Sequence, residues 1–503
     1  METHSTGSLP ASSSGSPAFI ASATATPAAS CLRPPSPAPG ADDTPPFRLL
    51  DLPQELIVAI VHALNERDPS PTFPSGPSTD LLSLAATSRW FNAVCQPLVW
   101  RSVRYKPEEL IRPVEWRRTR DLRSLRELLR KREEQGGTLP IVQLSLEQPT
   151  ESDDAELDGN VEEREADAEE AAYVEIIEAA ARKTLQVLFL KDTEVRAANA
   201  ARLIRAIADS PRVSAVRLNQ VDFIEGKPGV VPSLPPLTRL KTLQIMHSDP
   251  ELFGLADKCP SLDSLLLWPS TRRVGPHIES IKSLLPHLLN LSLDSVHGAS
   301  AFRSLADEIL RLSQSGLTLP LEELFLEGPS RAADLSVLVS AISHLPSLRR
   351  LSLYQVKKPT PALFHDIVTA VPQLEALTIV SGDCQDPVEW PAPLDEYLPH
   401  LRKLTKLRFF AFDRMSPPRF DSVEGSDVWL LQKRLEFDAL SQVARAAPSL
   451  REAVAITSDV SEGSSGYFAQ FRREKGRTRI TLKHKTVNDF LIGYDRWVKV
   501  EDD

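Results

Sequence analysis

The chain of 503 residues is 42% hydrophobic and 25% charged, which is ordinary for a globular protein of two or more domains. No apolar run approaches the roughly 18 residues of a membrane-spanning helix. The first residues also lack the basic region and apolar core of a secretory signal. The net charge of -10 is concentrated in residues 151–170, where eleven acidic side chains accompany one basic side chain, Arg164. The rest of the chain is near neutral, which argues against nucleic acid or a membrane as a partner.

The residue types that carry chemistry do not form a recognisable motif. Four cysteines lie far apart, at Cys31, Cys95, Cys259 and Cys384. This spacing indicates neither a disulfide framework nor a zinc site, and it favours an intracellular location, cytoplasmic or nuclear. The sequence has no phosphate-binding glycine loop, dinucleotide fingerprint, zinc-protease helix or hydrolase nucleophile elbow. We therefore expect no enzyme, no cofactor and no metal.

Residues 1–46 are rich in Ser, Ala and Pro. Their small apolar side chains cannot offset the entropy of ordering the chain, and proline recurs without a period, so we predict a disordered segment. The alternative is an organellar transit peptide. That alternative requires several arginines, and the segment has only Arg33.

The first regular pattern begins at residue 50. Leu52, Leu56, Ile60 and Leu64 stand four residues apart and predict one apolar helical stripe. A second helical pattern, "DLLSLAATSRWFNAVCQPLVWRSV", follows over residues 80–103. A domain of about 60 residues is marginal and cannot bury this many large side chains by itself. We expect part of its apolar surface to bind a partner; the alternative is that these helices cap the domain that follows.

The same residues resemble an F-box. The stretches "LPQELIVAIVHAL" and "DLLSLAATSRWFNAVCQPLVW" contain L-P-x-E-L-x-x-x-I, then D-L-L-x-L, and a closing L-x-W. The resemblance implies an all-α domain over residues 47–105 that docks on the Skp adaptor of cullin-based ubiquitin ligases. The loop at residues 65–79 is longer than is usual in the family. The adaptor contacts that the resemblance implies are Leu52, Pro53, Leu56, Ile60, Leu81, Leu84, Leu98 and Trp100.

Linker helices are predicted over residues 106–137, and beyond residue 138 the chain repeats. The pattern L-x-x-L-x-L recurs from "IVQLSL" at 141 to "LEALTI" at 374. From the second copy to the ninth the intervals are 28, 27, 22, 26, 33, 27 and 26 residues, which indicates a solenoid. Helical stripes such as "FRSLADEILRL" lie between the copies. Over residues 138–460 we predict parallel strands on a concave face, helices on a convex face and one core between them.

This pattern resembles a degenerate leucine-rich repeat. The asparagine or cysteine ladder of that family is absent, because the corresponding positions include Val221, Val296 and Val356. The predicted class is therefore α/β, with a small all-α F-box followed by a leucine-rich-repeat-like solenoid. The runner-up is a doubly wound α/β enzyme, for which the repeat period is too even.

Two segments depart from the repeat. The acidic residues 151–170 lie between the first two copies, where the interval is 44 residues, and we predict a solvated, mobile insertion. Residues 461–503 contain "YFAQFRREKGRTRITLK", which predicts a hairpin around Lys475 and Gly476. Because a solenoid needs its terminal faces covered, we expect this segment to be a cap. A second ligand-binding module is the alternative.

The residues that alternate with the repeated leucines are predicted to point outward on the concave face. Several are aromatic or large and apolar where a solvated face carries small polar groups, and exposed aromatic side chains near an arginine are typical of interfaces. The alternative is that residues 461–503 or the acidic insertion fold back and cover them. The predicted target-binding residues are Phe189, Leu266, Trp268, Phe325, Arg350 and Tyr354.

Two functions fit these observations. In the first, the chain is the substrate-recognition subunit of a Skp–cullin–F-box ubiquitin ligase. The F-box then binds the Skp adaptor, and through it a cullin, while the solenoid holds an unknown target protein. In the second, the chain is an interaction scaffold that uses the same solenoid without a ligase role. Binding of the Skp adaptor distinguishes them.

Overall fold

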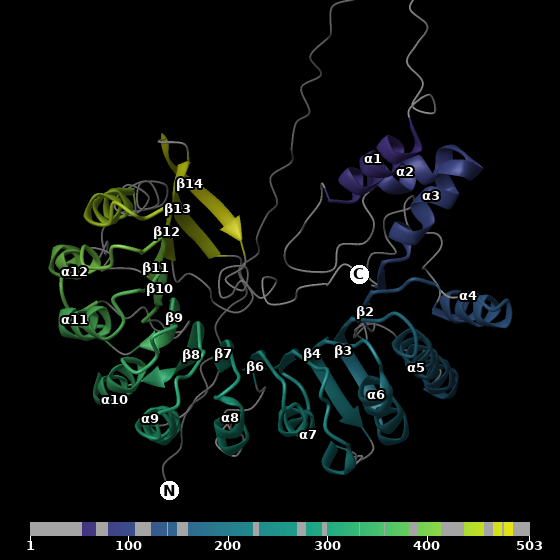
Figure 1. The fold of residues 1–503 in the computed structure, drawn as a ribbon, viewed down its shortest axis with the longest axis horizontal. Coiled ribbons are helices and arrows are strands. Elements are labelled where there is room, and N and C mark those ends of the chain that lie inside the picture. The colour runs from purple at the N-terminus through teal and green to yellow at the C-terminus, as the bar shows by residue number, and fades with distance from the viewer. Residues whose placement is uncertain are drawn as a thin grey trace, which may run out of the picture. The chain divides into compact units, whose positions relative to one another are not determined.

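The fold is that of a computed structural model. The structure describes residues 53–66, 79–105, 122–137, 139–147, 159–224, 231–268, 278–293, 299–330, 332–356, 358–381, 390–413, 437–456, 466–474 and 477–485. In this part of the chain fourteen strands form one sheet in chain order, with helices between most of them (Figure 1). The predicted α/β class is confirmed, and the architecture is compatible with a solenoid-like repeat. No described helix is long and apolar enough to cross a membrane.

Neighbouring strands in the sheet are also neighbours in the chain. The first twelve pair in parallel, and the last two continue the sheet as antiparallel strands. Their bounds are β1 Ser102–Tyr105, β2 Gln143–Glu147, β3 Val187–Arg196, β4 Ala215–Ile224, β5 Thr242–Met246, β6 Ser264–Trp268, β7 Asn290–Leu293, β8 Glu323–Ser330, β9 Arg350–Val356, β10 Ala376–Ile379, β11 Phe409–Asp413, β12 Glu452–Ile456, β13 Gly466–Glu474 and β14 Arg477–Lys485.

The register aligns the repeated leucines. Leu188 pairs with Val216, Val216 with Leu243, and Leu243 with Leu265, so each repeat places its apolar residues in the same column. Side chains alternate between the two faces of a strand, so these columns all lie on one face. There they are buried in a cluster that runs through the repeats.

The helices of the repeats cover that face, which we call the helix face; the opposite face is the strand face. The core cluster joins strand leucines to helix side chains such as Leu203, Ile309 and Phe364. Figure 1 shows the helices following one side of the sheet. They are α4 Leu122–Glu134, α5 Gly159–Ala181, α6 Ala197–Asp209, α7 Pro250–Phe253, α8 Ile278–Leu284, α9 Ala299–Gln314, α10 Ala332–Ile342, α11 Pro361–Ala370 and α12 Leu394–Leu401, with a further helix at 437–446.

A residue in the left-handed conformation recurs at one corner of the repeat. Asp192, Gln220, His247 and Gln355 have φ angles of 48°, 53°, 50° and 58°. Each lies five residues after the start of its strand, and Gly328, with φ 155°, holds the same position in β8. Side chains with a Cβ rarely adopt this conformation, so its recurrence marks a turn required by the repeat.

Hydroxyl side chains form hydrogen bonds to the backbone at this corner, where the asparagine ladder is missing. Ser248, which follows His247, donates its Oγ hydrogen to the carbonyl of Met246 (2.7 Å) and accepts the N–H of Val221 (3.1 Å). Thr193 donates to the carbonyl of Lys191 at 2.9 Å. The bond to Val221 joins two successive repeats, so Ser248 partly replaces the ladder.

The first three helices form a helical unit: α1 Gln54–Glu66, α2 Thr79–Thr87 and α3 Arg89–Val99. The predicted boundary at residue 105 does not separate this unit from the repeats. Strand β1 lies inside the predicted helical domain, yet it pairs with β2 as the first strand of the sheet. Trp100 and Val103 are buried in the same core cluster as the repeat leucines. The sheet therefore begins at Ser102 rather than beyond residue 138.

The prediction of a mobile insertion at 151–170 is wrong for residues 159–170, which are the first half of α5. Acidic residues in the first turns of a helix interact favourably with its dipole, and the alanine-rich continuation favours the helix. Glu170 is buried and accepts the N–H of Arg196 and the side-chain amide of Asn199, both at 2.8 Å. Residues 151–158 lie outside the described part of the chain, as do residues 1–46.

The predicted hairpin is observed as β13 and β14. Arg473 pairs with Thr478 and Glu474 with Arg477, so the turn falls at residues 475–476, which lie outside the described part. Strand β13 also pairs with β12, so the hairpin extends the sheet. Residues 486–503, which follow it, lie outside the described part as well.

Candidate protein-binding surfaces

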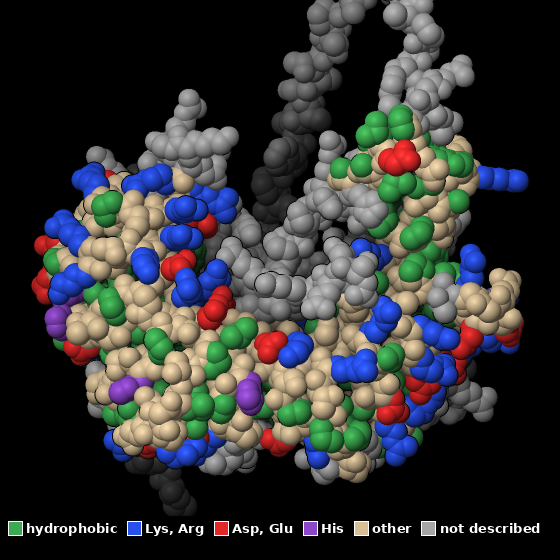
Figure 2. All heavy atoms as spheres, in the orientation of Figure 1, with side chains coloured by type: hydrophobic (Ala, Val, Ile, Leu, Met, Phe, Trp, Pro, Cys, Tyr) green, Lys and Arg blue, Asp and Glu red, His purple; other side chains and the backbone are tan. Residues whose placement is uncertain are grey.

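Helix α1 divides its apolar residues between two faces. Ile57 and Val61 are buried, whereas Leu56 is 51% exposed and Ile60 is half-buried. Residues four apart share a helix face, so Leu56 and Ile60 form an outward apolar stripe beside the inward one. On α2 and α3 the outward apolar residues are the half-buried Leu84 and the 40% exposed Trp90. Figure 2 shows hydrophobic side chains gathered over this unit.

Helix α3 has a well-defined start and end. The Oγ of Ser88 accepts the N–H of Phe91 at 3.2 Å and caps the first turn. In its last turns the indole N–H of Trp100 donates to Gln96 Oε1 (2.5 Å), whose amide donates to Asn92 Oδ1 (2.7 Å). This chain of hydrogen bonds links the outer part of α3 to the core of the repeats, where the ring of Trp100 is buried.

The structure divides the predicted adaptor-binding residues into two groups. Pro53 and Leu56 are exposed, and Ile60 and Leu84 are half-buried. Leu52 lies outside the described part of the chain. Leu81, Leu98 and Trp100 are buried, which corrects the prediction for these three: they pack inside this chain and support the unit from within.

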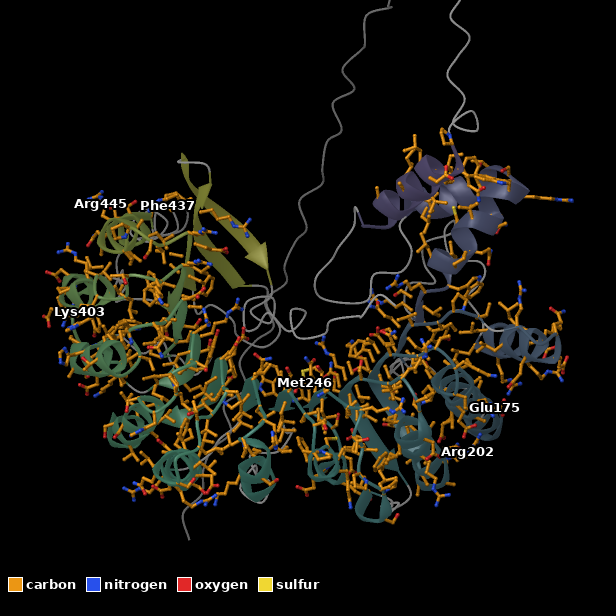
Figure 3. All side chains as sticks on the ribbon, in the orientation of Figure 1. Glu175, Arg202, Met246, Lys403, Phe437 and Arg445 are labelled. Atoms are coloured by element: carbon orange, nitrogen blue, oxygen red, sulfur yellow. The ribbon has the colours of Figure 1, made fainter. Side chains whose placement is uncertain are left out.

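The strand face carries a second apolar cluster, separate from the core under the helices. Its members come from β5 to β12, and each alternates with the repeated leucines. In Figure 3 the labelled Met246 lies on this side of the sheet, away from Glu175 and Arg202 on the helices. We call this set the strand-face cluster: Met246, Leu266, Trp268, Phe325, Tyr354, Val380, Ala411 and Val454, with Phe409 packed against it.

Aromatic rings form the centre of the strand-face cluster. The ring centroids of Trp268 and Phe325 are 6.4 Å apart, and those of Phe325 and Tyr354 are 4.9 Å apart. The ring of His247 lies 5.8 Å from that of Trp268, and burial lowers the pKa of this histidine. These separations are typical of favourable aromatic pairs.

The prediction that these aromatic side chains are exposed is wrong. Trp268 is only 6% exposed, and Leu266, Phe325 and Tyr354 are buried as well. The alternation predicted the face correctly, because these residues are absent from the helix-face core and present in the strand-face cluster. Alternation gives the direction of a side chain, but whether another segment lies over that face depends on tertiary structure.

The two remaining predicted target-binding residues lie outside the cluster. Phe189 is buried, and the guanidinium of Arg217 lies 4.9 Å from the centre of its ring. Arg350 is half-buried and forms an ion pair with Glu323 at 3.0 Å. The structure therefore brings together four of the six predicted residues and places the other two beside charged neighbours.

The strand face changes character toward the first repeats. Lys191 on β3 contacts Glu147 on β2 at 2.7 Å and Asp192 at 2.6 Å. Burial disfavours its charge, but hydrogen bonds to Asp192 and Glu147 outweigh this and raise the pKa of Lys191. Arg217 on β4 lies two positions earlier in the register, beside Phe189. Strands β2 to β4 therefore carry charges where β5 to β12 carry the apolar cluster.

A buried carboxylate lies at the other end of the strand face. Asp413 accepts the N–H (2.7 Å) and the hydroxyl (2.6 Å) of Ser381 and the indole N–H of Trp390 (2.7 Å). Burial, with the nearby charges of Glu327 and Asp413, raises the pKa of Tyr354 above its ordinary value.

Four members of the strand-face cluster were missed from the sequence: Met246, Val380, Ala411 and Val454. The same alternation was available to find them, since each stands directly beside a core residue in the sequence. Ala411 and Val454 were missed because their repeats, "LRFFAF" and "LREAVAI", depart most from the leucine pattern. Among the described residues no group of His, Cys, Asp and Glu is arranged to hold a metal ion.

Comparison with known proteins shows no family. No family model matches the sequence, and no curated protein matches it. A solved structure described as the crystal structure of Rad7 and Elc1 complex in yeast is similar over 66% of this chain and 87% of that chain. The sequence identity is 12% and the TM-score 0.33, a likeness too distant to support an argument about function.

Proposed function

We propose that this chain is the substrate-recognition subunit of a Skp–cullin–F-box ubiquitin ligase. The helical unit is then an F-box that docks the Skp adaptor, and through it a cullin. The remaining chain is a leucine-rich-repeat solenoid that binds the protein to be ubiquitinated. The proposal rests on the F-box resemblance of residues 50–103 and on one observation, the outward apolar stripe of α1.

The division of α1 into two apolar faces supports an interface. The inward residues Ile57 and Val61 pack inside the unit, whereas Leu56 is 51% exposed and Ile60 is only half-buried. A single exposed leucine is normal on a protein surface. Here it is accompanied by exposed or half-buried apolar residues on all three helices, and three of the set, Leu56, Ile60 and Leu84, are adaptor contacts that the resemblance implies.

The junction between the helical unit and the repeats also favours a receptor. Only Trp100 and Arg101 separate α3 from β1, and the ring of Trp100 is buried in the repeat core. A target held by the first repeats would therefore be held at a fixed distance from a bound adaptor. Such rigidity suits a subunit that presents a target to a ligase, and a scaffold does not require it.

In this proposal the chain carries no catalytic group. The ligation chemistry belongs to other subunits of the ligase, and this chain contributes binding energy and position. We accordingly expect no activity, cofactor requirement or metal requirement from the purified chain, and a cytoplasmic or nuclear location.

The test is Leu56→Glu. A charge on the outward stripe should weaken binding of the Skp adaptor at least about thirtyfold, since interface anchors contribute about 2 kcal/mol or more. The matched control is Leu317→Glu, because Leu317 is 41% exposed and lies between α9 and β8. The affinity of each purified variant for the adaptor would be measured by calorimetry. Both should melt near the temperature of the parent chain.

Two outcomes argue against the proposal. Equal affinity of the parent chain and Leu56→Glu would show that the outward stripe is not the adaptor site. Absence of any adaptor binding by the parent chain would favour the second function, an interaction scaffold without a ligase role.

A further inference from the structure

A groove with a volume of about 560 Å³ lies between α3 and α4. Its floor is apolar, because Trp100 and Leu139 are buried in the repeat core and Leu128 packs against that core. Its walls are helix faces: the lining residues of α3 stand three, four and seven residues after Arg89, and those of α4 stand four apart. The described lining residues are Arg89, Asn92, Ala93, Gln96, Trp100, Leu128, Arg132 and Leu139.

The groove carries positive charge that no neighbouring carboxylate balances. Asp and Glu are absent from its described lining residues. Arg89 and Arg132 are exposed, and neither side chain forms an ion pair or a hydrogen bond with another described residue. On α4 the carboxylates of Glu127 and Glu134 instead pair with Arg130. In a chain with a net charge of -10, the groove is therefore a local site that favours an anion.

The amide side chains of the α3 wall are oriented to donate hydrogen bonds. An indole N–H can only donate, so its bond to Gln96 (2.5 Å) turns the amide oxygen of Gln96 toward Trp100. The amide nitrogen of Gln96 then faces Asn92 and donates to its Oδ1 at 2.7 Å. The nitrogen of Asn92 keeps two N–H groups, for which the described residues provide no acceptor. This wall therefore offers mainly donors, which suits a carboxylate.

The length of the groove fits a chain segment better than a small anion. Arg89 and Trp100 are eleven residues apart, which is about 16 Å at the rise of an α-helix. An extended chain rises about 3.3 Å per residue, so about five residues span this length. A protein segment of mixed acidic and apolar residues would satisfy both the donor-lined walls and the apolar floor.

We propose that this groove binds an extended acidic segment of a partner protein. The carboxylates of the segment contact Arg89 and Arg132, whose planar guanidinium groups bind a carboxylate through two hydrogen bonds. Its apolar side chains pack on the floor. This inference goes beyond the proposed function, because no lining residue belongs to α1 or α2. The groove is a second binding site, separate from the outward stripe of α1.

The experiment begins with an array of immobilised five-residue peptides, probed with the labelled full chain. At each position the array carries glutamate, glutamine, lysine, leucine, phenylalanine, serine or phosphoserine. The chain should select glutamate at two or more positions, with leucine or phenylalanine between them. Absence of selection for glutamate would overturn the proposal. Selection of phosphoserine over glutamate would also overturn it and would assign the groove to a phosphorylated partner.

Charge reversal then locates the site, with affinity for the selected acidic peptide measured by fluorescence anisotropy. Arg89→Glu with Arg132→Glu should weaken binding at least about tenfold, because it removes charge-assisted hydrogen bonds and adds repulsion. The matched control is Arg402→Glu with Arg445→Glu, which makes the same change of net charge at exposed residues outside the groove (Figure 3 labels Arg445). The control should bind like the parent chain. Equal losses in the two variants would overturn the proposal.

Asn92→Asp tests the amide wall in a variant that keeps its internal bond. A carboxylate at this position still accepts the hydrogen bond from Gln96, so the chain should melt at the temperature of the parent. The donors of Asn92 are replaced by a negative charge, so affinity for the acidic peptide should fall about tenfold. Unchanged affinity would overturn the proposal.

The peptide measurement needs no adaptor. Leu56→Glu, which should weaken adaptor binding, should bind the acidic peptide like the parent chain. The adaptor site and the groove can therefore fail separately.

Discussion

The two faces of one sheet are both apolar over β5 to β12, yet they differ in kind. On the helix face the columns are leucine or isoleucine from β5 to β10 and become phenylalanine and alanine in β11 and β12, and the repeats present a helix with an apolar stripe to them. On the strand face the corresponding residues are as different as Met246, Trp268, Tyr354 and Ala411. A uniform column indicates a scaffold that is copied from repeat to repeat. The varied column has no such repeated partner among the described residues.

The strand face itself has two regions that sharpen this contrast. Strands β2 to β4 carry Glu147, Lys191 and Arg217, with an ion pair between β2 and β3 and the guanidinium of Arg217 over the ring of Phe189. Strands β5 to β12 carry the strand-face cluster, with aromatic contacts between neighbours. The helix face shows no such division among the described repeats. Packing of the repeated helices on the sheet therefore explains the composition of the helix face. It does not explain why the strand face is divided into a charged region and an apolar region.

The largest expected effect tests the two faces with neighbouring residues of β8. Leu324→Ala removes a fully buried leucine from the helix-face core and should lower the free energy of unfolding by about 2–5 kcal/mol. Phe325→Ala, on the other face, should be coupled to Tyr354→Ala, whose ring lies 4.9 Å away, and should be additive with Leu324→Ala. Urea denaturation of the single and double variants measures both differences.

The outcome that would break the comparison is a coupling of Phe325→Ala to Leu324→Ala as strong as its coupling to Tyr354→Ala. The two faces would then be parts of one continuous scaffold, coupled through the backbone of β8.

A smaller effect is expected at the corner of the repeat. Ser248→Ala should lower the free energy of unfolding by about 1–3 kcal/mol, since it leaves the buried N–H of Val221 without its acceptor. The matched control is Ser343→Ala, because Ser343 is exposed and its hydroxyl donates at 2.6 Å to the carbonyl of Ser340. Equal stability of the two variants would show that the bond between repeats contributes nothing.

The smallest effect concerns pH. Burial, with the nearby charges of Lys403 and His365, lowers the pKa of His400 below its ordinary 6.5. The unfolded chain then binds this proton more readily, so stability is full above pH 6.5 and falls as the pH decreases toward the folded pKa. His400→Gln should therefore lose less stability between pH 7.5 and pH 5 than the parent chain. Identical losses in two denaturation series would contradict this.

The repeats could be predicted because their information is local. Leucines at fixed spacing place a strand, and the following helical stripe places its cover, so one repeat suffices to predict its neighbours. The hairpin of β13 and β14 was predictable for the same reason. Alternation also assigned Trp268 and Tyr354 to the strand face, because the side-chain direction in a strand depends only on the parity of the position.

The wrong predictions concern residues whose burial and contacts depend on parts of the chain that are distant in sequence. The ring of Trp268 packs beside those of His247 and Phe325, which belong to other repeats. Glu170 belonged to an acidic run that indicated a mobile insertion, yet it is fixed by bonds to Arg196 and Asn199 in another repeat. Trp100 matched the closing L-x-W of a separate domain, but its ring is buried in the repeat core. None of these contacts has a signature at fixed sequence spacing.

The attachment of the helical unit through β1 makes that unit the first member of a one-dimensional array. In such an array each member is stabilised mainly by its immediate neighbours, so a perturbation at one end decays along the stack. A protein that binds α1 would slow the local opening of β1 and β2 first, and amide exchange in β11 and β12 would hardly change. The helical unit thus has the thermodynamic role of a capping repeat, whatever it binds.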